Sequence, residues 1–265
     1  MSHRRRIGRI GTPPHRWKKH RRSRRVAIDS EVVCADDVSQ RRFEIKCNGF
    51  ERFDLTMEEK KLNFAFRLVH IDNIPHILKN GIVKADSTNA NPNYVPIGDQ
   101  LVIEKRKNKR LSSSSWQNIG DFIPFYFGPR SPMLYVIQHG YNGVRRIEAE
   151  DIVYCVIRLD DIIKGGIECC FTDGHVLNSL TQVFPAESLN RIESYVRYSD
   201  VYARRWDDEE DLDLKRRKEA ELLLKNDLPV QYIKGFVVYN EGAMQRLISM
   251  GVNERMVAVR PTFYF

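Results

Sequence analysis

The pattern of hydrophobic and polar positions divides the last three quarters of the chain into strands and short helices. The apolar runs at 64–71 (FAFRLVHI) and 151–159 (DIVYCVIRL) predict buried strands, and the second is apolar enough to be central in a sheet. A helix is predicted over 73–81, capped at its start by Asp72 or Asn73. The pattern therefore starts as strand followed by helix.

Further alternation continues to the C-terminus. The β-prone run FIPFYFG (122–128) leads into a helix that begins at Ser131 and Pro132. Residues 216–227 (RRKEAELLLKND) are helix-like in composition, yet 220–224 equally fit the start of a strand. A strand, a helix and a strand close the chain at 236–240, 241–251 and 256–265. This mixture predicts an α+β (mixed α/β) fold.

Composition adds a division into three parts. Hydrophobic residues make up 42% of the 265 residues, which is sufficient for a substantial core, and the net charge is +8. Residues 1–25 alone hold nine Arg, two Lys and no acid, so the remainder carries about three more acidic than basic residues. We expect a basic, disordered arm at 1–25, an N-terminal extension at 26–61 and a folded domain at 62–265.

The arm is attractive to any polyanion, but a solubilising tail and translation from upstream of the true start codon explain it equally well. It lacks the apolar segment of a secretory signal, and no stretch of about 18 apolar residues predicts a membrane span. The five cysteines are odd in number and form no C-x-x-C pair. We therefore expect no metal site, no disulfide framework and a cytoplasmic location.

Candidate site residues lie next to predicted strand ends and turns. His70 and Asn73 fit a half-buried histidine beside a helix cap, or ligands for an anion at a helix N-terminus. The run IEKRKNKR (103–110) fits a solvated helix face, or an arginine such as Arg106 that contacts a phosphate. Spacing alone does not choose among its cations.

Three more segments have both a structural and a functional interpretation. Tyr126 and Arg130, around the strand exit GPRSPM (128–133), are packing and surface residues unless they contact a ligand. FTDGH (171–175) is a turn motif, and Glu221 is most simply a surface glutamate on a helix. No single residue decides between enzyme and binding protein.

Taken together, five stretches resemble the DarT family of toxins, which ADP-ribosylate bases in single-stranded DNA. The resemblance spans roughly residues 64–265. It implies the ADP-ribosyltransferase fold, a split and mostly antiparallel sheet with surrounding helices that binds NAD+ in a cleft. In order, the stretches are VHIDNIPHILKNGI (69–82), IGDQLVIEKR (97–106), DFIPFYFGPRSPMLY (121–135), FTDGH (171–175) and EAELLL (219–224).

The resemblance also implies roles for individual residues. Arg106 matches the catalytic arginine of the family, with Lys107 as the neighbour that it is confused with most easily, and Glu221 matches the catalytic glutamate. The residues expected beside NAD+ are His70, Asn73, Tyr126 and His175. A carboxylate suits this chemistry because positive charge develops on the ribose as the nicotinamide bond breaks.

The activity implied is transfer of ADP-ribose from NAD+ to thymidine or guanosine in single-stranded DNA, without a metal, with a macrodomain antitoxin as partner. Tyr94 or Trp116 are candidates to stack bases. The acidic run WDDEEDLDLKRRK (206–218) lies where the acceptor is expected and opposes DNA binding. The alternatives are an acceptor in RNA or protein, NAD+ hydrolysis, and a non-catalytic nucleic-acid-binding protein that uses the basic arm.

Overall fold

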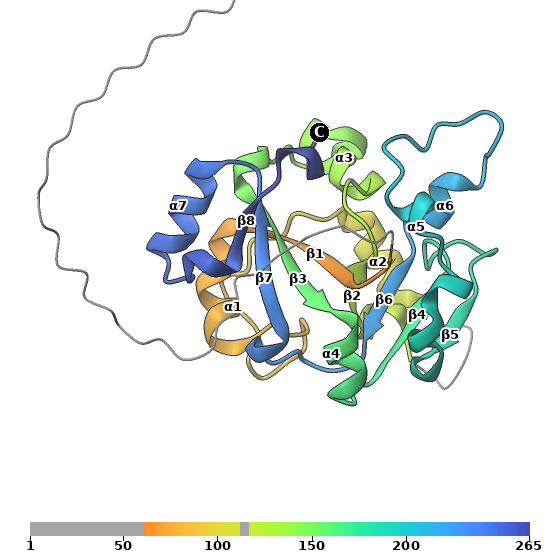
Figure 1. The fold of residues 1–265 in the computed structure, drawn as a ribbon, viewed down its shortest axis with the longest axis horizontal. Helices are drawn as coiled ribbons and strands as arrows, with labels where there is room; N and C mark the ends of the chain where they lie inside the picture. Colours follow the sequence, from red (N-terminus) through yellow and green to blue (C-terminus); the bar gives the residue numbers. More distant parts are fainter. Residues whose placement is uncertain (1–60, 112–116) are drawn as a thin grey trace, which may run out of the picture. The chain divides into compact units, whose positions relative to one another are not determined.

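An eight-stranded sheet forms the centre of the computed structural model (Figure 1). The structure describes residues 61–111 and 117–265, which belong to one compact unit of residues 47–265. The strand order is β5-β4-β6-β2-β1-β3-β7-β8. The strands are β1 (Phe64–His70), β2 (Ile123–Tyr126), β3 (Ile152–Arg158), β4 (Cys169–Thr172), β5 (Val183–Pro185), β6 (Glu221–Leu224), β7 (Ile233–Val238) and β8 (Val257–Val259).

Neighbouring strands are antiparallel except β7 and β8, which are parallel. The predicted mixed fold with a mostly antiparallel sheet is therefore confirmed. The interpretations of the basic arm, of residues 26–60 and of Trp116 lie outside the described residues.

Short helices connect the strands, and local sequence explains where they begin and end. Helix α3 begins after Ser131, whose hydroxyl accepts from the Leu134 amide, and ends at Gly140, a left-handed residue with φ 68°. Helix α7 is capped in the same way by Asn240. The helices are α1 (Ile74–Asn80), α2 (Gln100–Asn108), α3 (Pro132–His139), α4 (Leu159–Lys164), α5 (Tyr198–Val201), α6 (Leu214–Lys218) and α7 (Glu241–Ser249).

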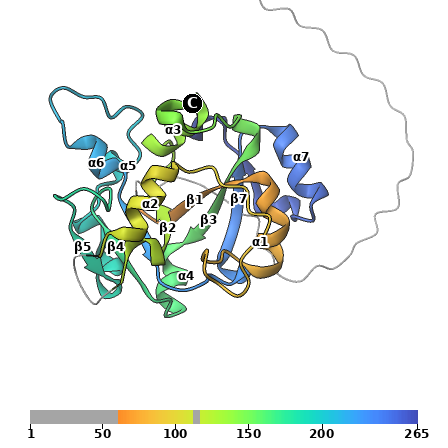
Figure 2. The same ribbon diagram turned by 180° about the vertical axis from the view of Figure 1, so that it is seen from behind.

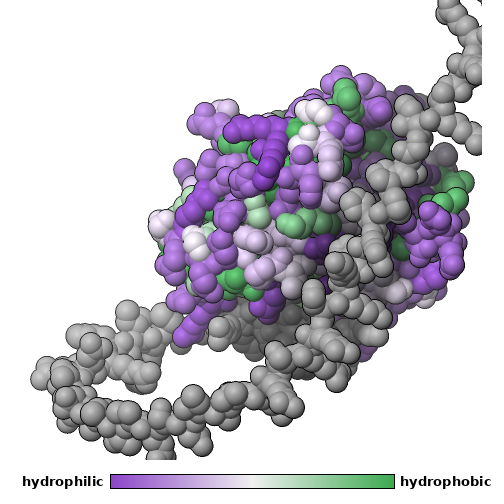
Figure 3. All heavy atoms as spheres, turned by 90° about the horizontal axis from the view of Figure 1, so that it is seen from above, coloured by the Kyte–Doolittle hydropathy of each residue, from purple (hydrophilic) through white to green (hydrophobic). Residues whose placement is uncertain are grey.

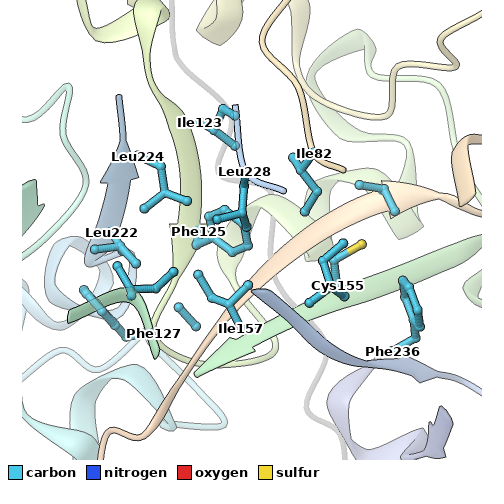
Figure 4. Close-up of a cluster of buried hydrophobic side chains, with 14 of the residues drawn as sticks. Ile82, Ile123, Phe125, Phe127, Cys155, Ile157, Leu222, Leu224, Leu228 and Phe236 are labelled. Atoms are coloured by element: carbon cyan, nitrogen blue, oxygen red, sulfur yellow. The ribbon is translucent and has the colours of Figure 1, made fainter. Parts of the chain in front are cut away.

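Each face of the sheet covers a separate core. Alternate residues of β2, β3 and β6 point to one side, where Phe125, Cys155 and Leu222 belong to one hydrophobic cluster (Figure 4). Residues from α1, α4 and α7 complete that cluster. On the opposite face, Phe66 and Tyr154 pack against α3 and the C-terminal segment. The continuous apolar character of β3 follows from this burial on both faces.

The sheet is split between β1 and β2. Seven residue pairs join β1 to β3, whereas only Phe66 and Tyr126 pair between β1 and β2. Pro124 of β2 has no amide proton for a ladder, and its carbonyl instead accepts from Nη1 of Arg67 at 3.0 Å. Arg67 therefore spans the opening between the two half-sheets.

The structure corrects two expectations from the sequence. The run 216–227 is the end of α6 followed by strand β6, so the surface-helix interpretation of Glu221 is wrong. Asn73 occupies the N-cap position of α1 but makes no capping hydrogen bond, because a 3-10 turn (Ile71–Asn73) leads directly into the helix and its side chain binds elsewhere.

The surface is largely hydrophilic in the view from above (Figure 3), with hydrophobic residues in small separate groups. In the part of the chain that the structure describes, no helix has the length and apolar character needed to cross a membrane. Helix α2 lies beside the sheet, and Figure 2 shows it from behind.

Candidate functional site

Glu221 is the centre of the site. It is the first residue of β6, lies directly opposite Tyr126 of β2, and has 0% of its surface exposed. Its Oε2 accepts from Nη1 of Arg106 at 2.8 Å, and its Oε1 accepts from the Val176 amide at 3.1 Å. A buried carboxylate with a charged donor on one oxygen and a backbone donor on the other is held in one orientation.

The backbone of Glu221 is fixed from the neighbouring strand. The ladder between β4 and β6 ends at Phe171 and Leu222, and the Thr172 side chain continues it. Its hydroxyl accepts from the Glu221 amide at 3.0 Å and donates to the Gly174 carbonyl at 2.7 Å. Thr172, which is fully buried, thereby couples the start of β6 to the turn after β4.

Arg106 reaches this carboxylate from α2. The helix begins after Asp99, whose side chain accepts from the Leu101 and Val102 amides. Because successive helical residues point about 100° apart, Arg106 faces inward with 8% exposed while Lys107 lies exposed to solvent. Arg106 is therefore the cation that contacts Glu221, and the solvated interpretation of this helix face is wrong for that position.

One nitrogen of Arg106 is left without a partner. Nη2 is buried and makes no hydrogen bond, although Nη1 is paired with Glu221. A buried guanidinium nitrogen without an acceptor is costly in free energy. It is a donor available to an oxygen or nitrogen acceptor on a bound molecule.

Three of the expected site residues share one face of the sheet. Tyr126 lies opposite both Phe66 and Glu221, so these three side chains point to the same side. His70 is four residues beyond Phe66 on β1 and therefore also on that side, about 13 Å along the strand. The spacing suits an extended dinucleotide rather than a compact ligand.

His70 and Asn73 differ in what their side chains contact. Nδ1 of His70 accepts from the Asp72 amide at 3.2 Å, which leaves Nε2 as the donor nitrogen of the neutral ring. The Asp72 carboxylate, at 3.4 Å from the same nitrogen, contacts it only weakly. The Asn73 amide is 1% exposed and binds both the carbonyl and the amide of Val95, at 2.8 and 2.9 Å. Asn73 thus fixes the loop that leads to α2.

His175 lies beside Glu221 in the turn that follows β4. Burial lowers the pKa of His175, and Glu221 opposes that shift while Arg106, Lys109 and Lys215 add to it. The lowered pKa favours the neutral imidazole at neutral pH. A neutral histidine beside a carboxylate accepts or donates a hydrogen bond without adding charge.

Neighbouring groups give the site an unusual electrostatic environment. Burial and the adjacent Glu221 raise the pKa of the half-buried Glu219 to about 8. Burial, Glu221 and Glu219 also raise the pKa of the Tyr126 hydroxyl. The buried Lys218, the last residue of α6, donates to the carbonyls of Val201 and Pro129 at 3.0 and 3.3 Å. Sequence reasoning missed Thr172, Lys218 and Glu219. Thr172 lies within the quoted stretch FTDGH and Glu219 within EAELLL, whereas Lys218 is only the last cation of the charged run 206–218.

The acidic run before β6 is largely compensated within the molecule. Asp207 pairs with Arg205, and Asp211 and Asp213 bind arginines of α6. The repulsion of a DNA acceptor that this run was expected to cause is thereby limited to the exposed acidic residues 208–210. Tyr94, one of the candidate stacking residues, is 46% exposed. In the described ranges, no cluster of three or more His, Cys, Asp and Glu side chains has the arrangement of a metal site.

Comparison with solved structures gives the same fold. Thermus sp. 2.9 DarT in complex with ADP-ribosylated ssDNA aligns with a TM-score of 0.67 at 24% identity, covering 77% of this chain and 97% of that one. Thermosipho africanus DarTG in complex with ADP-ribose aligns with a TM-score of 0.64 at 26% identity, covering 77% of this chain and 51% of that one. The shared architecture confirms the ADP-ribosyltransferase fold.

Sequence comparison identifies the family. A DNA ADP-ribosyl transferase of Escherichia coli O127:H6 is 31% identical over 199 residues, which is 72% of this chain and 90% of the relative. One from Mycobacterium tuberculosis is 27% identical over 210 residues, or 76% and 88%. Residues 66–265 match the family model described as ssDNA thymidine ADP-ribosyltransferase, DarT. The chain belongs to the DarT family.

Proposed function

We propose that this chain transfers ADP-ribose from NAD+ to a base of single-stranded DNA and releases nicotinamide, with Glu221 and Arg106 as its catalytic residues. Family membership supports the reaction class and the co-substrate. The observation that carries the residue roles is the buried ion pair between Arg106 of α2 and Glu221 of β6, to which the turn after β4 adds the Val176 amide.

Glu221 stabilises the positive charge that develops on the ribose when the bond to nicotinamide breaks. Its carboxylate is preorganised by the Arg106 guanidinium and the Val176 amide, so it needs no rearrangement when that charge appears. The same carboxylate is placed to take the proton from the attacking base nitrogen. Burial strengthens both effects because the local dielectric is low.

Arg106 positions the reacting groups. Nη1 orients Glu221, while the unpartnered Nη2 offers a hydrogen bond to a phosphate oxygen of NAD+ or to the acceptor. This orphaned donor is the feature of the site that best fits NAD+ as the co-substrate. Lys107 points to solvent and takes no part.

His70, Asn73, Tyr126 and His175 are assigned to NAD+ binding in this proposal. His70 and Tyr126 lie on the face that carries Glu221, and His175 borders the carboxylate. Asn73 acts through the Val95 loop, because both ends of its amide are already bound. The dinucleotide would extend along β1 from Glu221 toward His70.

Thymidine is the base to test first, since the matching family model is described by that nucleoside. The test incubates the protein with labelled NAD+ and an oligonucleotide containing thymidine, then the same oligonucleotide without thymidine, its RNA counterpart and buffer alone. We expect label only in thymidine-containing DNA, and none with Glu221→Gln. Lys107→Gln is the matched control and should label normally.

Other outcomes identify the alternatives. Label in RNA or protein would identify that molecule as the acceptor in place of DNA. Release of free ADP-ribose without labelled DNA would indicate NAD+ hydrolysis. Label with Glu221→Gln equal to that of the unchanged protein would contradict the assigned mechanism.

We further propose that the protein is a cytoplasmic toxin whose mark is removed by a macrodomain partner. A relative from Thermosipho africanus is named a DNA ADP-ribosyl transferase-DNA ADP-ribosyl glycohydrolase fusion protein, 27% identical over 49% of its length. Expression should arrest growth, and co-expression of a DNA ADP-ribosyl glycohydrolase should restore it. Arrest that persists despite removal of the mark would contradict this role.

A further inference from the structure

We propose that Arg216 is a positioning residue, which holds the turn at 173–176 so that the Val176 amide meets the carboxylate of Glu221. The proposal rests on the assignment of Glu221 as the catalytic carboxylate. It concerns a residue that does not itself touch Glu221, and it follows from a chain of contacts between α6 and the turn.

Arg216 joins two segments through nearly all of its donors. Nε and Nη2 bind the two carboxylate oxygens of Asp213 at 2.7 and 2.8 Å. Nη1 donates to Asp173 at 3.1 Å and to the Thr181 hydroxyl at 3.3 Å. Its own carbonyl accepts from the His175 amide at 2.9 Å. The side chain therefore connects α6 to Asp173 at the start of the turn and to Thr181 beyond its end, while the backbone carbonyl of Arg216 holds His175.

The turn is closed by further bonds to the same partners. The Thr181 hydroxyl donates to the His175 carbonyl at 2.8 Å, and Asp173 accepts from the Gln182 amide at 2.8 Å. A side chain at Gly174 would place its Cβ 2.9 Å from both Cγ and the carbonyl oxygen of Arg216. The turn is thus packed directly against Arg216, with no room for a larger residue.

Displacement of this turn would reach the carboxylate. Val176, the last residue of the turn, donates its amide to Oε1 of Glu221, and His175 lies beside the same carboxylate. Arg216 also belongs to α6, which leads within three residues to the start of β6. One side chain therefore fixes both the strand that carries Glu221 and the turn that orients it.

Lysine cannot replace this residue, because an ammonium group lacks the planar fork that binds Asp213 with two nitrogens and Asp173 with a third. Arg217 provides a matched control. Its side chain is 17% exposed against 10% for Arg216, and it binds three carboxylates, of Asp200, Asp211 and Asp213, where Arg216 binds two. None of these lies in the 173–176 turn.

The experiment compares Arg216→Lys with Arg217→Lys in the full chain. Binding of carba-NAD+ by calorimetry counts the native sites, and kcat is then expressed per site at saturating NAD+ and DNA. We expect Arg216→Lys to lower kcat by about 10- to 100-fold, with KM for NAD+ within twofold. Arg217→Lys should keep kcat within threefold, although both should lower the melting temperature.

Thr181→Val serves as a milder second variant if Arg216→Lys does not fold. It removes one contact of Arg216 and the bond to His175, and should lower kcat severalfold with KM for NAD+ unchanged. An unchanged kcat in Arg216→Lys would overturn the proposal. If only Thr181→Val folds, an unchanged kcat in that variant would overturn it instead. An equal loss of kcat in Arg217→Lys would also overturn it. Glu221→Gln, measured in parallel, tests the proposed function separately. An active Glu221→Gln variant would overturn the mechanism. An inactive Glu221→Gln together with a fully active Arg216→Lys would overturn only the positioning role.

Discussion

At the scale of single residues, the Arg106–Glu221 pair combines a structural and a catalytic demand. Removing one member of a buried ion pair leaves an uncompensated charge and costs about 3–5 kcal/mol of stability. Alanine variants at these positions therefore mix folding defects with loss of chemistry. Isosteric or charge-preserving variants separate the two.

Glu221→Gln retains an acceptor oxygen for Arg106 and loses the negative charge. We expect kcat to fall by about 10²–10³-fold or more, because the charge that stabilises the ribose cation is absent. Carba-NAD+ binding should stay within about fivefold. Calorimetry and single-turnover kinetics measure the two effects, and an undiminished kcat contradicts the role of the charge.

Arg106→Lys tests the other member of the pair against its neighbour. The ammonium cannot bind Glu221 and still present a second donor in the geometry of Nη2, so we expect kcat to fall about 10²-fold. Lys107→Gln should change kcat by less than twofold, since that side chain is exposed. Steady-state kinetics on both variants measure the two losses. A larger loss of kcat in Lys107→Gln than in Arg106→Lys would assign the catalytic role to Lys107 instead of Arg106.

The sequence identified the residue types here but not their environment. Glu221 was recognised through EAELLL, yet its burial arises from pairing with β2 and β4, whose residues lie about 50 to 100 positions away. Only the family resemblance separates Arg106 from Lys107 in the sequence. Which of the two cations faces Glu221 depends on how α2 is rotated relative to the distant strand β6. No local sequence pattern predicts that rotation.

At the scale of elements, the split between β1 and β2 creates the geometry of the site. Composition favoured a helix for 216–227, but the apolar run at 222–224 is buried on both faces between β2 and β4, and this burial outweighs helix propensity. Strands β1 and β3 were predictable because their apolar runs are long, whereas the strand predicted at 236–240 overlaps β7 only at 236–238. The split was expected only through the family resemblance.

Arg67→Met tests the bridge across that split. The Pro124 carbonyl would lose its partner, and we expect the free energy of unfolding to fall by about 1–3 kcal/mol. Arg158→Met, at an exposed position on β3, should change it by about 0.5 kcal/mol or less. Urea denaturation measures both. Equal effects at the two positions would show that Arg67 is not a specific bridge.

At the scale of the whole molecule, stability should depend on pH through Glu219 and Lys218. Burial and Glu221 raise the pKa of Glu219 to about 8, against opposing effects of Lys215 and Lys218. Between the ordinary carboxyl pKa and 8, the folded state keeps a proton that the unfolded state has released. The free energy of unfolding contributed by Glu219 is therefore greatest below that ordinary pKa and is lost as the pH rises to about 8.

Lys218 acts in the opposite direction at higher pH. Burial and Arg130 lower its pKa from 10.5 to about 8, while Glu219 opposes the shift. Between 8 and 10.5 the unfolded state binds more protons, so stability rises with pH. We expect a minimum near pH 8 in urea denaturation. Glu219→Gln should remove the falling limb and Lys218→Met the rising one; a limb that survives its variant belongs to another group.

The central claim is that Glu221 directs ADP-ribose onto a base of single-stranded DNA. Tandem mass spectrometry of one thymidine-containing oligonucleotide, after incubation with NAD+ and either the unchanged protein or Glu221→Gln, tests it most directly. We predict one ADP-ribosyl group on the thymine base with the unchanged protein, and an unmodified strand with the variant. An ADP-ribosyl group on the strand produced equally by both proteins, or none produced by either, would contradict it.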